Sequence, residues 1–353
     1  MNHNASMPVS FFCEQDCLAS MAKYGLDAKL RCTSPLDWDA LLQTIEYVPV
    51  SYTQAMIDYQ CTYYQGMGGV WHDCSVVLYR DRKPCAVWLL SISCVENEWR
   101  ISSSGEALIS PLFDSRLSVK TIKSVVADCY RFLSGVASEL SCRIVIQEPF
   151  LDKEGLGEWY QRAIQEATSR LVRHDLYLDL KPNLTTIRSF FRKSYRPLIS
   201  SGEKLWEISI CREADENVWD EFRLLHLTVA GKVTRSIKTW DAQLQAISQQ
   251  IAFLVYLRNS DGRMVGGGLF YTSRDEGLYA VGAYDRSLFD KPLGHVVQYH
   301  AILEMKKRNL RWYKIGVRPY PSDTPKPSEK EISIADFKQG FSSHLHSRIE
   351  LCR

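Results

Sequence analysis

Along the first half of the chain, short runs of alternating apolar and polar residues give way to segments with a helical period. The runs predict strands, and the segments with apolar residues every three or four positions predict helices. The first half is therefore expected to contain strands at Val76–Leu78, Cys85–Ser93 and near Trp99–Ser102, a helix at Val119–Leu140, a strand at Arg143–Gln147, a helix at Glu158–Leu171 and a strand at Leu176–Leu180.

The second half repeats this order more clearly. The segment Asn259–Arg263 (NSDGR) is a strong turn signal between two apolar runs and predicts a hairpin. Helices are expected near Thr185–Arg196, at Glu216–Ala230, Trp240–Gln250 and Pro292–Asn309, with strands at Trp206–Cys211, Ala252–Leu257, Met264–Tyr271, Leu278–Tyr284 and Trp312–Gly316. The repetition predicts two domains of similar design, residues 1–175 and residues 176–353.

Composition narrows the class of protein. With 353 residues, 45% hydrophobic and 24% charged, the chain is expected to fold into two globular domains with separate cores. A formal net charge of +2 provides no overall field toward nucleic acid or anionic lipid. The eleven cysteines are mostly isolated, and Cys13 and Cys17 have no second close pair to complete a zinc site, so no metal is expected.

Targeting signals are not expected. Met1–Gln15 contains no lysine or arginine, unlike the start of a signal peptide. No apolar run approaches the ~20 residues that cross a bilayer. The sequence therefore predicts a cytoplasmic protein with reduced thiols, and leaves its oligomeric state open.

The start of the helix Pro292–Asn309 is a candidate binding site for an activated donor. Free N–H groups and the helix dipole at such an end favour phosphate or carboxylate. Leu293, Gly294 and His295 lie in the first turn, and Tyr284 ends the strand before it. Gly294 either lets a ligand approach the backbone or serves close packing. His295 is a candidate general base, since a near-neutral pKa suits removal of a proton from an amine.

Two further groups are candidate substrate-binding residues. Arg188, Arg192 and Arg196 are spaced by four, so a single helix would align three guanidinium groups on one face to hold phosphates, although a solvated basic face would have the same pattern. The segment Leu225–Trp240 brings four polar or aromatic residues between two apolar helices, and is either an acceptor-binding loop or an ordinary helix connection. These four residues are His226, Lys232, Arg235 and Trp240.

The C-terminal half resembles FemAB-like proteins, a family of tandem GNAT-fold acyl and aminoacyl transferases. The resemblance rests on Leu176–Leu180 followed by Arg188–Ile199, on Leu278–Asp285 followed by Pro292–Gly316, and on the late motif Phe337–Lys338 with Phe341. It departs from the family at Lys314, where an Asp is usual. The resemblance implies an α/β (α+β) fold of two tandem GNAT-like domains, each a mixed central sheet flanked by helices, with the N-terminal domain degenerate.

The resemblance also implies an activity. In aminoacyl-transferring members the motif lysine faces the donor and stabilises the transition state, which makes Lys338 a candidate catalytic residue alongside His295. We expect an N-acyltransferase that uses acyl-CoA, most simply acetyl-CoA, to acylate a nucleotide-linked amino sugar in cell-surface glycan synthesis.

Two alternatives remain open. The first is a peptidoglycan aminoacyltransferase like FemX, with aminoacyl-tRNA as donor; this is the only role in which we expect a nucleic-acid partner. The second is a non-catalytic binding module, which the departure at Lys314 favours. The sequence does not specify the acyl chain or the acceptor sugar.

Overall fold

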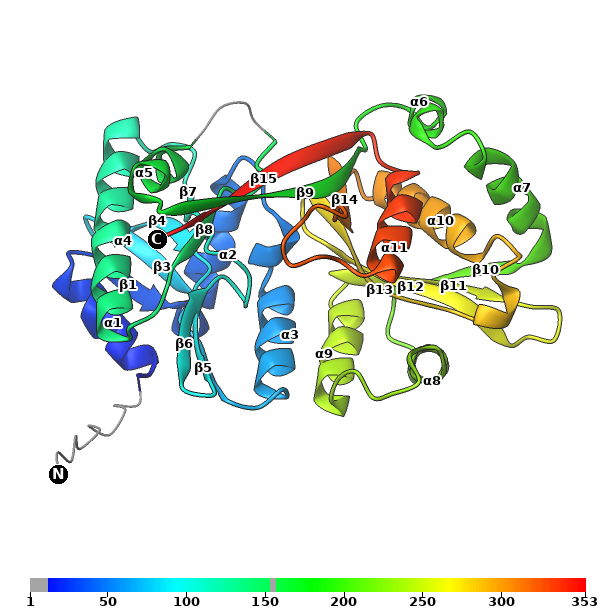
Figure 1. Ribbon diagram of the computed structural model, residues 1–353, viewed down its shortest axis with the longest axis horizontal. Coiled ribbons are helices and arrows are strands. Elements are labelled where there is room, and N and C mark those ends of the chain that lie inside the picture. The colour runs from blue at the N-terminus through cyan, green and yellow to red at the C-terminus, as the bar shows by residue number, and fades with distance from the viewer. Residues whose placement is uncertain (1–11, 153–156) are drawn as a thin grey trace.

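The computed structural model describes residues 12–152 and 157–353, which form two lobes side by side (Figure 1). The predicted absence of a signal peptide concerns Met1–Gln15, of which the first eleven residues lie outside the described part of the chain. No helix in the described part is long and apolar enough to span a bilayer.

The N-terminal lobe contains five α-helices and eight short strands within its described residues. Their bounds are α1 (Glu14–Lys23), β1 (Asp27–Leu30), α2 (Pro35–Thr44), α3 (Gln54–Gln65), β2 (Val70–Asp73), β3 (Val76–Arg80), β4 (Lys83–Trp88), β5 (Ser91–Val95), β6 (Glu98–Ser102), β7 (Leu112–Phe113), α4 (Val119–Glu139), β8 (Val145–Gln147) and α5 (Glu158–Glu166), with 3₁₀ turns at Arg31–Thr33 and Val50–Tyr52.

The remaining elements belong mainly to the C-terminal lobe. They are β9 (Ser169–Asp179), α6 (Leu184–Phe190), α7 (Tyr195–Leu205), β10 (Glu207–Cys211), α8 (Glu216–Ala230), α9 (Ile237–Ser248), β11 (Ala252–Arg258), β12 (Met264–Thr272), β13 (Glu276–Tyr284), α10 (Leu293–Lys307), β14 (Trp312–Val317), α11 (Glu329–Gln339) and β15 (His344–Cys352), with a 3₁₀ turn at Arg286–Leu288.

One sheet connects the lobes. Its eight strands run in the order β10-β11-β12-β13-β14-β9-β15-β8, so it begins in the C-terminal lobe and ends in the N-terminal one. β15 pairs antiparallel with β9 over nine residue pairs and then with β8. These two long strands cross between the lobes in Figure 1. The N-terminal lobe adds a four-stranded sheet, β1-β3-β4-β7, and a three-stranded sheet, β2-β5-β6.

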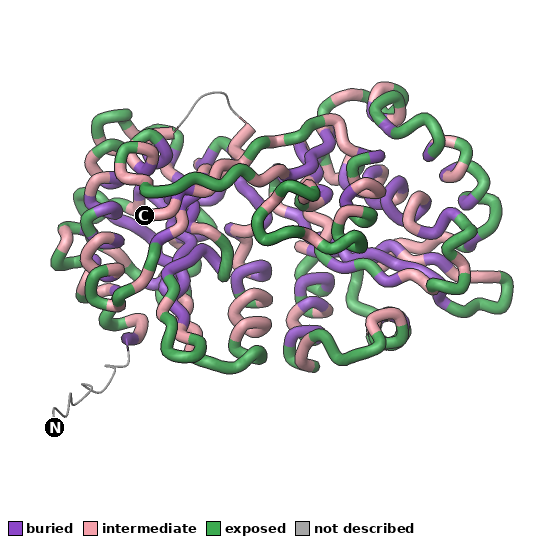
Figure 2. The backbone as a smooth tube through the Cα atoms, in the orientation of Figure 1, coloured by how far each residue is buried: buried purple, intermediate pink, exposed green. Residues whose placement is uncertain are grey.

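The C-terminal core lies on both faces of the large sheet, because β12 is buried along its whole length. On one face, Phe253 and Phe270 pack with residues of α7 and α10. On the other face, Trp219 of α8 and Trp240 of α9 pack on the strands, and Met56 of α3 joins them from the N-terminal lobe. Figure 2 shows the buried strands at the centre of each lobe. The two lobes therefore share part of one core.

A polar contact also joins the lobes at the β12–β13 turn. Arg274 donates to the carbonyls of Leu42 (3.0 Å) and Ile45 (2.5 Å). In the opposite direction, the N–H of Val48 donates to Asp275 (2.9 Å). Hydrogen bonds to charged groups contribute about 1.5–3 kcal/mol when buried, and less at Arg274, whose side chain is 39% exposed; together these contacts join the two lobes.

Most predicted elements of the second half are present. α8 spans the predicted Glu216–Ala230; Asp215 caps its first turn and Gly231, with φ +69°, ends it. The hairpin of β11 and β12 and the strands β13 and β14 lie where the pattern placed them. The predicted domain boundary near residue 175 falls inside β9, a strand that pairs with elements of both lobes through β15.

Three predicted elements were wrong. The helix expected near Thr185–Arg196 is two helices, α6 and α7, separated at residues 191–194. The strand expected at Cys85–Ser93 is divided between β4 and β5, which belong to different sheets. The helix expected at Glu158–Leu171 ends at Glu166, because residues from Ser169 onward extend to pair with β15.

Candidate functional site

The parallel strands of the C-terminal lobe separate after a short contact. β13 and β14 pair only from Glu276–Leu278 to Trp312–Lys314, and α10 connects them. Beyond these residues the facing edges of β13 and β14 no longer form backbone hydrogen bonds with each other. An opening of this kind leaves backbone N–H and C=O groups available to another group.

Lys338 of α11 lies in this opening. Its Nζ is 5.2 Å from the centre of the Tyr279 ring on β13. On the other side is Gly316 of β14, where a Cβ would come within 2.6 Å of that Nζ. The φ of Gly316 is +147°, which residues with a side chain rarely adopt. Glycine therefore makes room for the lysine.

The environment of Lys338 suits electrostatic stabilisation. Burial lowers the pKa of its ammonium group, and no carboxylate in the described part of the chain forms an ion pair with it. A positive charge or donor acts more strongly on a developing negative charge in such a water-poor place than in bulk solvent. This position fits the catalytic role that the family resemblance implies, which remains a proposal.

A cluster of hydroxyl groups lies beside the opening on the α10 face. The hydroxyls of Tyr279 and Tyr284 are 3.2 Å apart, and that of Tyr313 donates to Gln298 Oε1 at 2.5 Å. Burial raises the pKa of all three tyrosines, so each stays protonated. The Nε2 of fully buried Gln298 has no partner among the described residues. Tyr284, predicted to bind cofactor, belongs to this cluster.

The predicted donor-binding turn is covered by aromatic rings. Leu293 begins α10 and is 2% exposed, as part of the core. A Cβ on Gly294 would come within 2.9 Å of Phe337 Cζ, so the Phe337 ring lies directly on this glycine. His295 contacts the rings of Tyr195 (4.5 Å between centroids) and Phe337 (5.1 Å). The Phe337 ring therefore occupies the side of this turn on which a side chain at position 294 would lie.

His295 is a weak base in this position. Burial, and then the charge of Arg192, lower its pKa to about 4. The imidazole is thus neutral at pH 7 but binds a proton weakly. His295 is not among the described residues that line the cavity between the lobes or the cavity of the N-terminal lobe. Its role as general base remains a prediction.

The predicted row of arginines does not form on one helix face, because Arg188 is in α6 and Arg196 in α7. Pro197 lies in the first turn of α7. Each guanidinium has a partner: Arg188 faces the ring and hydroxyl of Tyr299, while Arg192 and Arg196 each donate to a backbone carbonyl. A joint phosphate clamp would require these contacts to change.

Three of the four residues from the α8–α9 connection come together. Trp240 is buried, with the Arg235 guanidinium 4.9 Å from its ring centre and the His226 ring 5.1 Å away. Arg235 also contacts the hydroxyl of Tyr59 on α3, at 3.4 Å. Burial and Arg235 lower the pKa of His226. Lys232 is exposed in the loop between α8 and α9.

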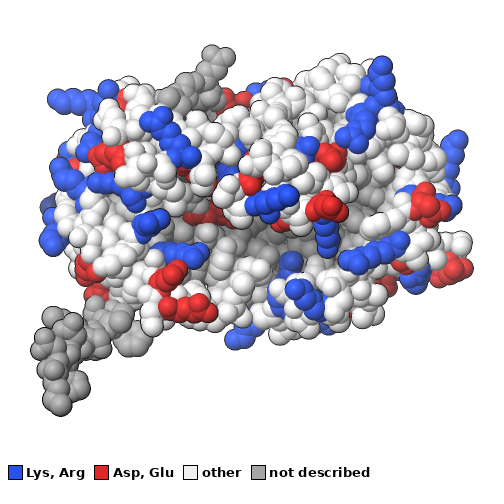
Figure 3. Space-filling model, in the orientation of Figure 1, with Lys and Arg blue, Asp and Glu red and all other residues white. Residues whose placement is uncertain are grey.

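A cavity of about 240 Å³ lies between the lobes. Its walls come from α3, the Ser103–Glu106 turn and the segment after β8 on one side, and from β9, β13, β14 and β15 on the other. The charged residues in its wall are Glu106, Glu148, Asp175, Glu276, Lys314 and Arg348, with His346 beside them. Figure 3 shows this face hollowed between the lobes, with basic and acidic side chains interspersed around it.

An ion-paired carboxylate organises the C-terminal wall of this cavity. Asp175 is 2% exposed, and its Oδ2 is 3.4 Å from Lys314 Nζ and 3.6 Å from Arg348 Nη1. Arg348 is held in turn by Glu350 at 3.2 Å. These side chains come from the adjacent strands β9, β14 and β15. Lys314, which stands where the family usually has Asp, is here the partner of Asp175.

Two other wall residues have shifted pKa values. Glu276 accepts hydrogen bonds from the Tyr47 hydroxyl (2.8 Å) and the Val50 N–H (3.1 Å), and burial raises its pKa. Burial lowers the pKa of His346, whose ring is 5.2 Å from that of Phe150. His346 is therefore neutral at pH 7 and able to accept a proton.

Sequence reasoning missed these wall residues, although a signal was present. Lys314 interrupts the apolar strand run WYKIG, and Asp175 directly precedes the alternating run LYLDL. A charge within a buried strand needs a partner, and such residues cluster at functional sites. Arg348 and His346 had no signal, because β15 was not predicted.

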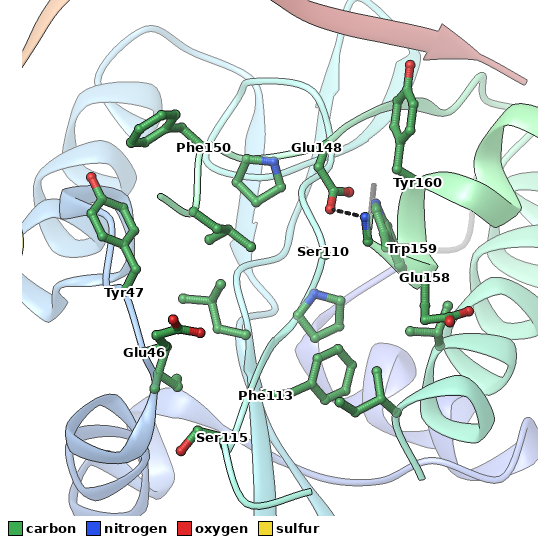
Figure 4. Close-up of a pocket in the computed structure, with 18 of the residues that line it drawn as sticks. Glu46, Tyr47, Ser110, Phe113, Ser115, Glu148, Phe150, Glu158, Trp159 and Tyr160 are labelled. Carbon is green, nitrogen blue, oxygen red and sulfur yellow. Dashed lines mark hydrogen bonds between the residues drawn. The ribbon is translucent and has the colours of Figure 1, made fainter. Parts of the chain in front are cut away.

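A larger cavity, of about 630 Å³, lies in the N-terminal lobe (Figure 4). It shares Glu148–Phe150, His346 and Arg348 with the cavity between the lobes, so one wall separates the two. Figure 4 shows Tyr47 and Phe150 on one side of it, Glu158, Trp159 and Tyr160 on the other, and Glu148 above.

Comparisons with known proteins identify the fold. No protein-family model and no curated protein matches the chain. Among solved structures, FemX is similar over 92% of this chain and 96% of its own, with a TM-score of 0.68 and 11% identity. L-PGS from Bacillus licheniformis is similar over 90% and 91% of the two chains, with a TM-score of 0.56 and 11% identity.

A conserved protein from Bacteroides thetaiotaomicron is similar over 93% of this chain and 99% of its own, with a TM-score of 0.56 and 8% identity. The described chain therefore has the fold of FemX, and the predicted α/β architecture of two tandem GNAT-like domains is confirmed. At these identities the likeness establishes the fold and not the activity.

Proposed function

We propose that this protein is an N-acyltransferase that moves an acyl group from acyl-CoA to the amine of an amino sugar, in cytoplasmic steps of cell-surface glycan synthesis. The position of Lys338 is the observation that carries the proposal. Its desolvated ammonium group lies between Tyr279 of β13 and Gly316 of β14, and the same two strands contribute Leu278 and Lys314 to the wall of the cavity between the lobes. A donor carbonyl in the opening would thus meet an amine in that cavity.

The chemistry requires few groups. The amine nitrogen attacks the thioester carbonyl, a C–N bond forms, the C–S bond breaks, and the CoA thiolate takes up a proton. Lys338 donates to the oxygen that becomes negative in the tetrahedral state. The amine must lose a proton to a base, for which neutral His346 in the cavity wall is better placed than His295.

The cavity between the lobes is the proposed acceptor site. Its carboxylates, Glu148 and Glu276, favour a group that bears an amine and hydroxyls. Arg235, Trp240 and His226 lie where α9 packs on α3, next to Met56 and Gln60 of the cavity wall. We assign them to the acceptor as well, through hydrogen bonds from Arg235, whose guanidinium lies over the ring of the buried Trp240.

A second candidate donor is aminoacyl-tRNA, as in a FemX-like peptidoglycan aminoacyltransferase. One observation favours it: rings from α7 and α11 cover the first turn of α10, where a CoA diphosphate was expected to bind. With this donor the same attack breaks a C–O ester bond, and Lys338 has the same role. The two donors therefore differ in how the carrier is held and not in the reaction.

Thermal shift and product analysis together test the proposal. At a ligand concentration ~100-fold above the Kd, binding adds about 2.7 kcal/mol to stability, a clear rise in Tm. We expect a shift with acetyl-CoA or a longer acyl-CoA, and N-acylation of glucosamine or a nucleotide-linked amino sugar by mass spectrometry.

Other outcomes have defined meanings. A shift with aminoacyl-tRNA and none with any CoA would establish the second donor. Binding without any N-acylated product would support a non-catalytic binding module, and the proposed activity would be wrong.

A further inference from the structure

The 630 Å³ cavity of the N-terminal lobe occupies the place that corresponds to the opening around Lys338. In the N-terminal lobe, Leu108 and Ile146 form a parallel bridge, with hydrogen bonds of 2.8 Å from Leu108 N to Val145 O and from Gln147 N to Leu108 O. α4 connects these two segments, as α10 connects β13 and β14. After the bridge the segments separate, and the cavity lies between them.

The walls of this cavity combine aromatic rings with hydrogen-bonding groups. Tyr47, Phe113 and Phe150 present aromatic surface. Ser110, Ser115, Glu46, Asp114, Glu148 and Glu158 supply oxygen atoms. Aromatic faces suit the C–H face of a sugar ring, and carboxylates accept hydrogen bonds from its hydroxyls. A pocket of this volume is large enough for a ligand of several rings.

The charges of the wall argue against an anionic ligand. Arg348 is the one Lys or Arg among the described lining residues, and Asp175 and Glu350 already pair with it. His346 is neutral at pH 7, because burial lowers its pKa. Of the lining carboxylates, Asp114 and Glu158 are already paired with Arg116 (2.5 Å) and Lys123 (3.1 Å), so among the described lining residues a phosphate or a CoA diphosphate would find no unpaired cation to hold it. A neutral polyhydroxylated ligand needs no such cation.

The position of the cavity connects it to the proposed acceptor site. The segment Glu148–Phe150, together with His346 and Arg348, lines both cavities. A ligand with its amine in the smaller cavity can thus extend past Phe150 into the larger one. The smaller cavity, at about 240 Å³, is below the usual size of a ligand pocket, whereas the larger is within it.

We infer that the N-terminal cavity is an extension subsite that binds uncharged sugar residues of an oligosaccharide acceptor whose amine-bearing residue lies between the lobes. The inference rests on the proposed function for the identity of the acceptor. It adds that the preferred acceptor is an oligosaccharide that contains the amino sugar. In the N-terminal lobe, the space between the separating segments therefore binds sugar residues of the acceptor.

A binding experiment tests the inference without any turnover. The ligands are glucosamine and a tetrasaccharide in which one glucosamine is followed by three N-acetylglucosamine residues. Val119→Trp introduces a large ring at a wall residue that is 62% exposed and absent from the wall of the smaller cavity. Leu36→Trp, at a position 83% exposed in the same lobe and outside the wall of either cavity, is the matched control.

We expect wild type and Leu36→Trp to bind the tetrasaccharide about tenfold more tightly than glucosamine by isothermal titration calorimetry. In Val119→Trp the tetrasaccharide affinity should fall to that of glucosamine, which itself stays unchanged. Equal affinities for both ligands in wild type, or an unchanged tetrasaccharide affinity in Val119→Trp, would overturn the inference. Length-dependent binding without N-acylation would leave the subsite standing and refute the proposed activity instead.

Discussion

In each lobe, two parallel segments that begin side by side separate and leave a space between them, and the two spaces differ in what occupies them. In the C-terminal lobe, β13 and β14 separate around an opening that Lys338 occupies, with the hydroxyl cluster of Tyr279, Tyr284 and Tyr313 beside it. In the N-terminal lobe, the segments after Leu108 and Ile146 separate around a cavity of about 630 Å³. One opening holds a desolvated cation, and the other is hollow, with aromatic and acidic side chains among its aliphatic lining residues.

This difference shows how one fold can divide its work between two copies. A group that stabilises charge in a transition state acts most strongly where water is largely excluded, and burial already lowers the pKa of Lys338. A subsite that recognises a large acceptor needs space. The segment Glu148–Phe150 borders both the cavity of the N-terminal lobe and the cavity between the lobes. An acceptor bound between the lobes can therefore extend into the N-terminal cavity.

The largest expected effect concerns the filled opening. Lys338→Met removes the cation and retains much of the side-chain volume. We expect turnover to fall by about 10²–10³, the usual effect of removing one donor to an oxyanion. Because burial lowers the pKa of Lys338, its charge costs stability at pH 7, so the variant should be at least as stable as wild type. Steady-state kinetics and urea denaturation measure the two effects.

Lys330→Ala is the matched control, because Lys330 is an exposed lysine on the same helix. It should leave both turnover and stability unchanged. If Lys338→Met lost stability and activity together, the residue would be structural. The contrast between a catalytic and a binding opening would then disappear.

The next effect concerns the wall of the cavity between the lobes. Asp175→Asn removes the carboxylate that pairs with Lys314 and Arg348 and leaves their charges partly uncompensated. We expect a loss of about 3 kcal/mol in the free energy of unfolding, at the lower end for a broken buried pair because Glu350 still holds Arg348. Urea denaturation measures it. A loss below about 1 kcal/mol, as for surface pairs, would show that solvent screens this network.

A third effect concerns His295 of α10, which we expect to influence the pH dependence of stability more than turnover. The folded-state pKa of His295 is lowered from 6.5 to about 4, so the unfolded chain binds more protons below pH 6.5 and stability falls as the pH drops toward 4. His295→Phe should remove about 2 kcal/mol of this loss, an amount reduced because solvent screens a half-buried imidazole. Urea midpoints at pH 7 and pH 4.5 measure it. If turnover instead falls strongly at pH 7, His295 is the general base after all.

The pattern of the second half predicted its elements well because local signals and tertiary structure agree there. Asp215 and Gly231 cap α8 at the positions the sequence indicated, and the NSDGR turn joins β11 and β12. The spacing of Arg188, Arg192 and Arg196 led to a wrong prediction of one continuous helix, because a period of four residues is compatible with a helix but does not require one. Phe191 leaves the helical conformation to pack in the core against Phe341.

The candidate site was only partly accessible to sequence reasoning. Lys338 was found through a family motif, whereas the ion-paired wall depends on β9, β14 and β15 lying next to one another. β15 brings residues from the end of the chain beside residues more than 160 positions earlier. Its sequence, HLHSRIELC, has little apolar periodicity, because much of the strand is exposed. No local sequence pattern predicts the pairing of β15 with β9.

The smallest effect tests the contact between the hollow opening and the other lobe. Tyr47 lines the N-terminal cavity and donates a hydrogen bond to Glu276 of β13. Tyr47→Phe keeps the ring and removes the donor, which should cost about 1 kcal/mol at pH 7. Burial already raises the pKa of Glu276, so the folded state binds more protons than the unfolded state above pH 4.5, and losing the donor should extend that difference. The cost should therefore shrink as the pH falls and Glu276 becomes protonated, since a neutral carboxyl needs the donor less. Urea denaturation of both proteins between pH 4.5 and pH 7 measures this trend, and a cost independent of pH would mean that Tyr47 stabilises the wall by packing alone.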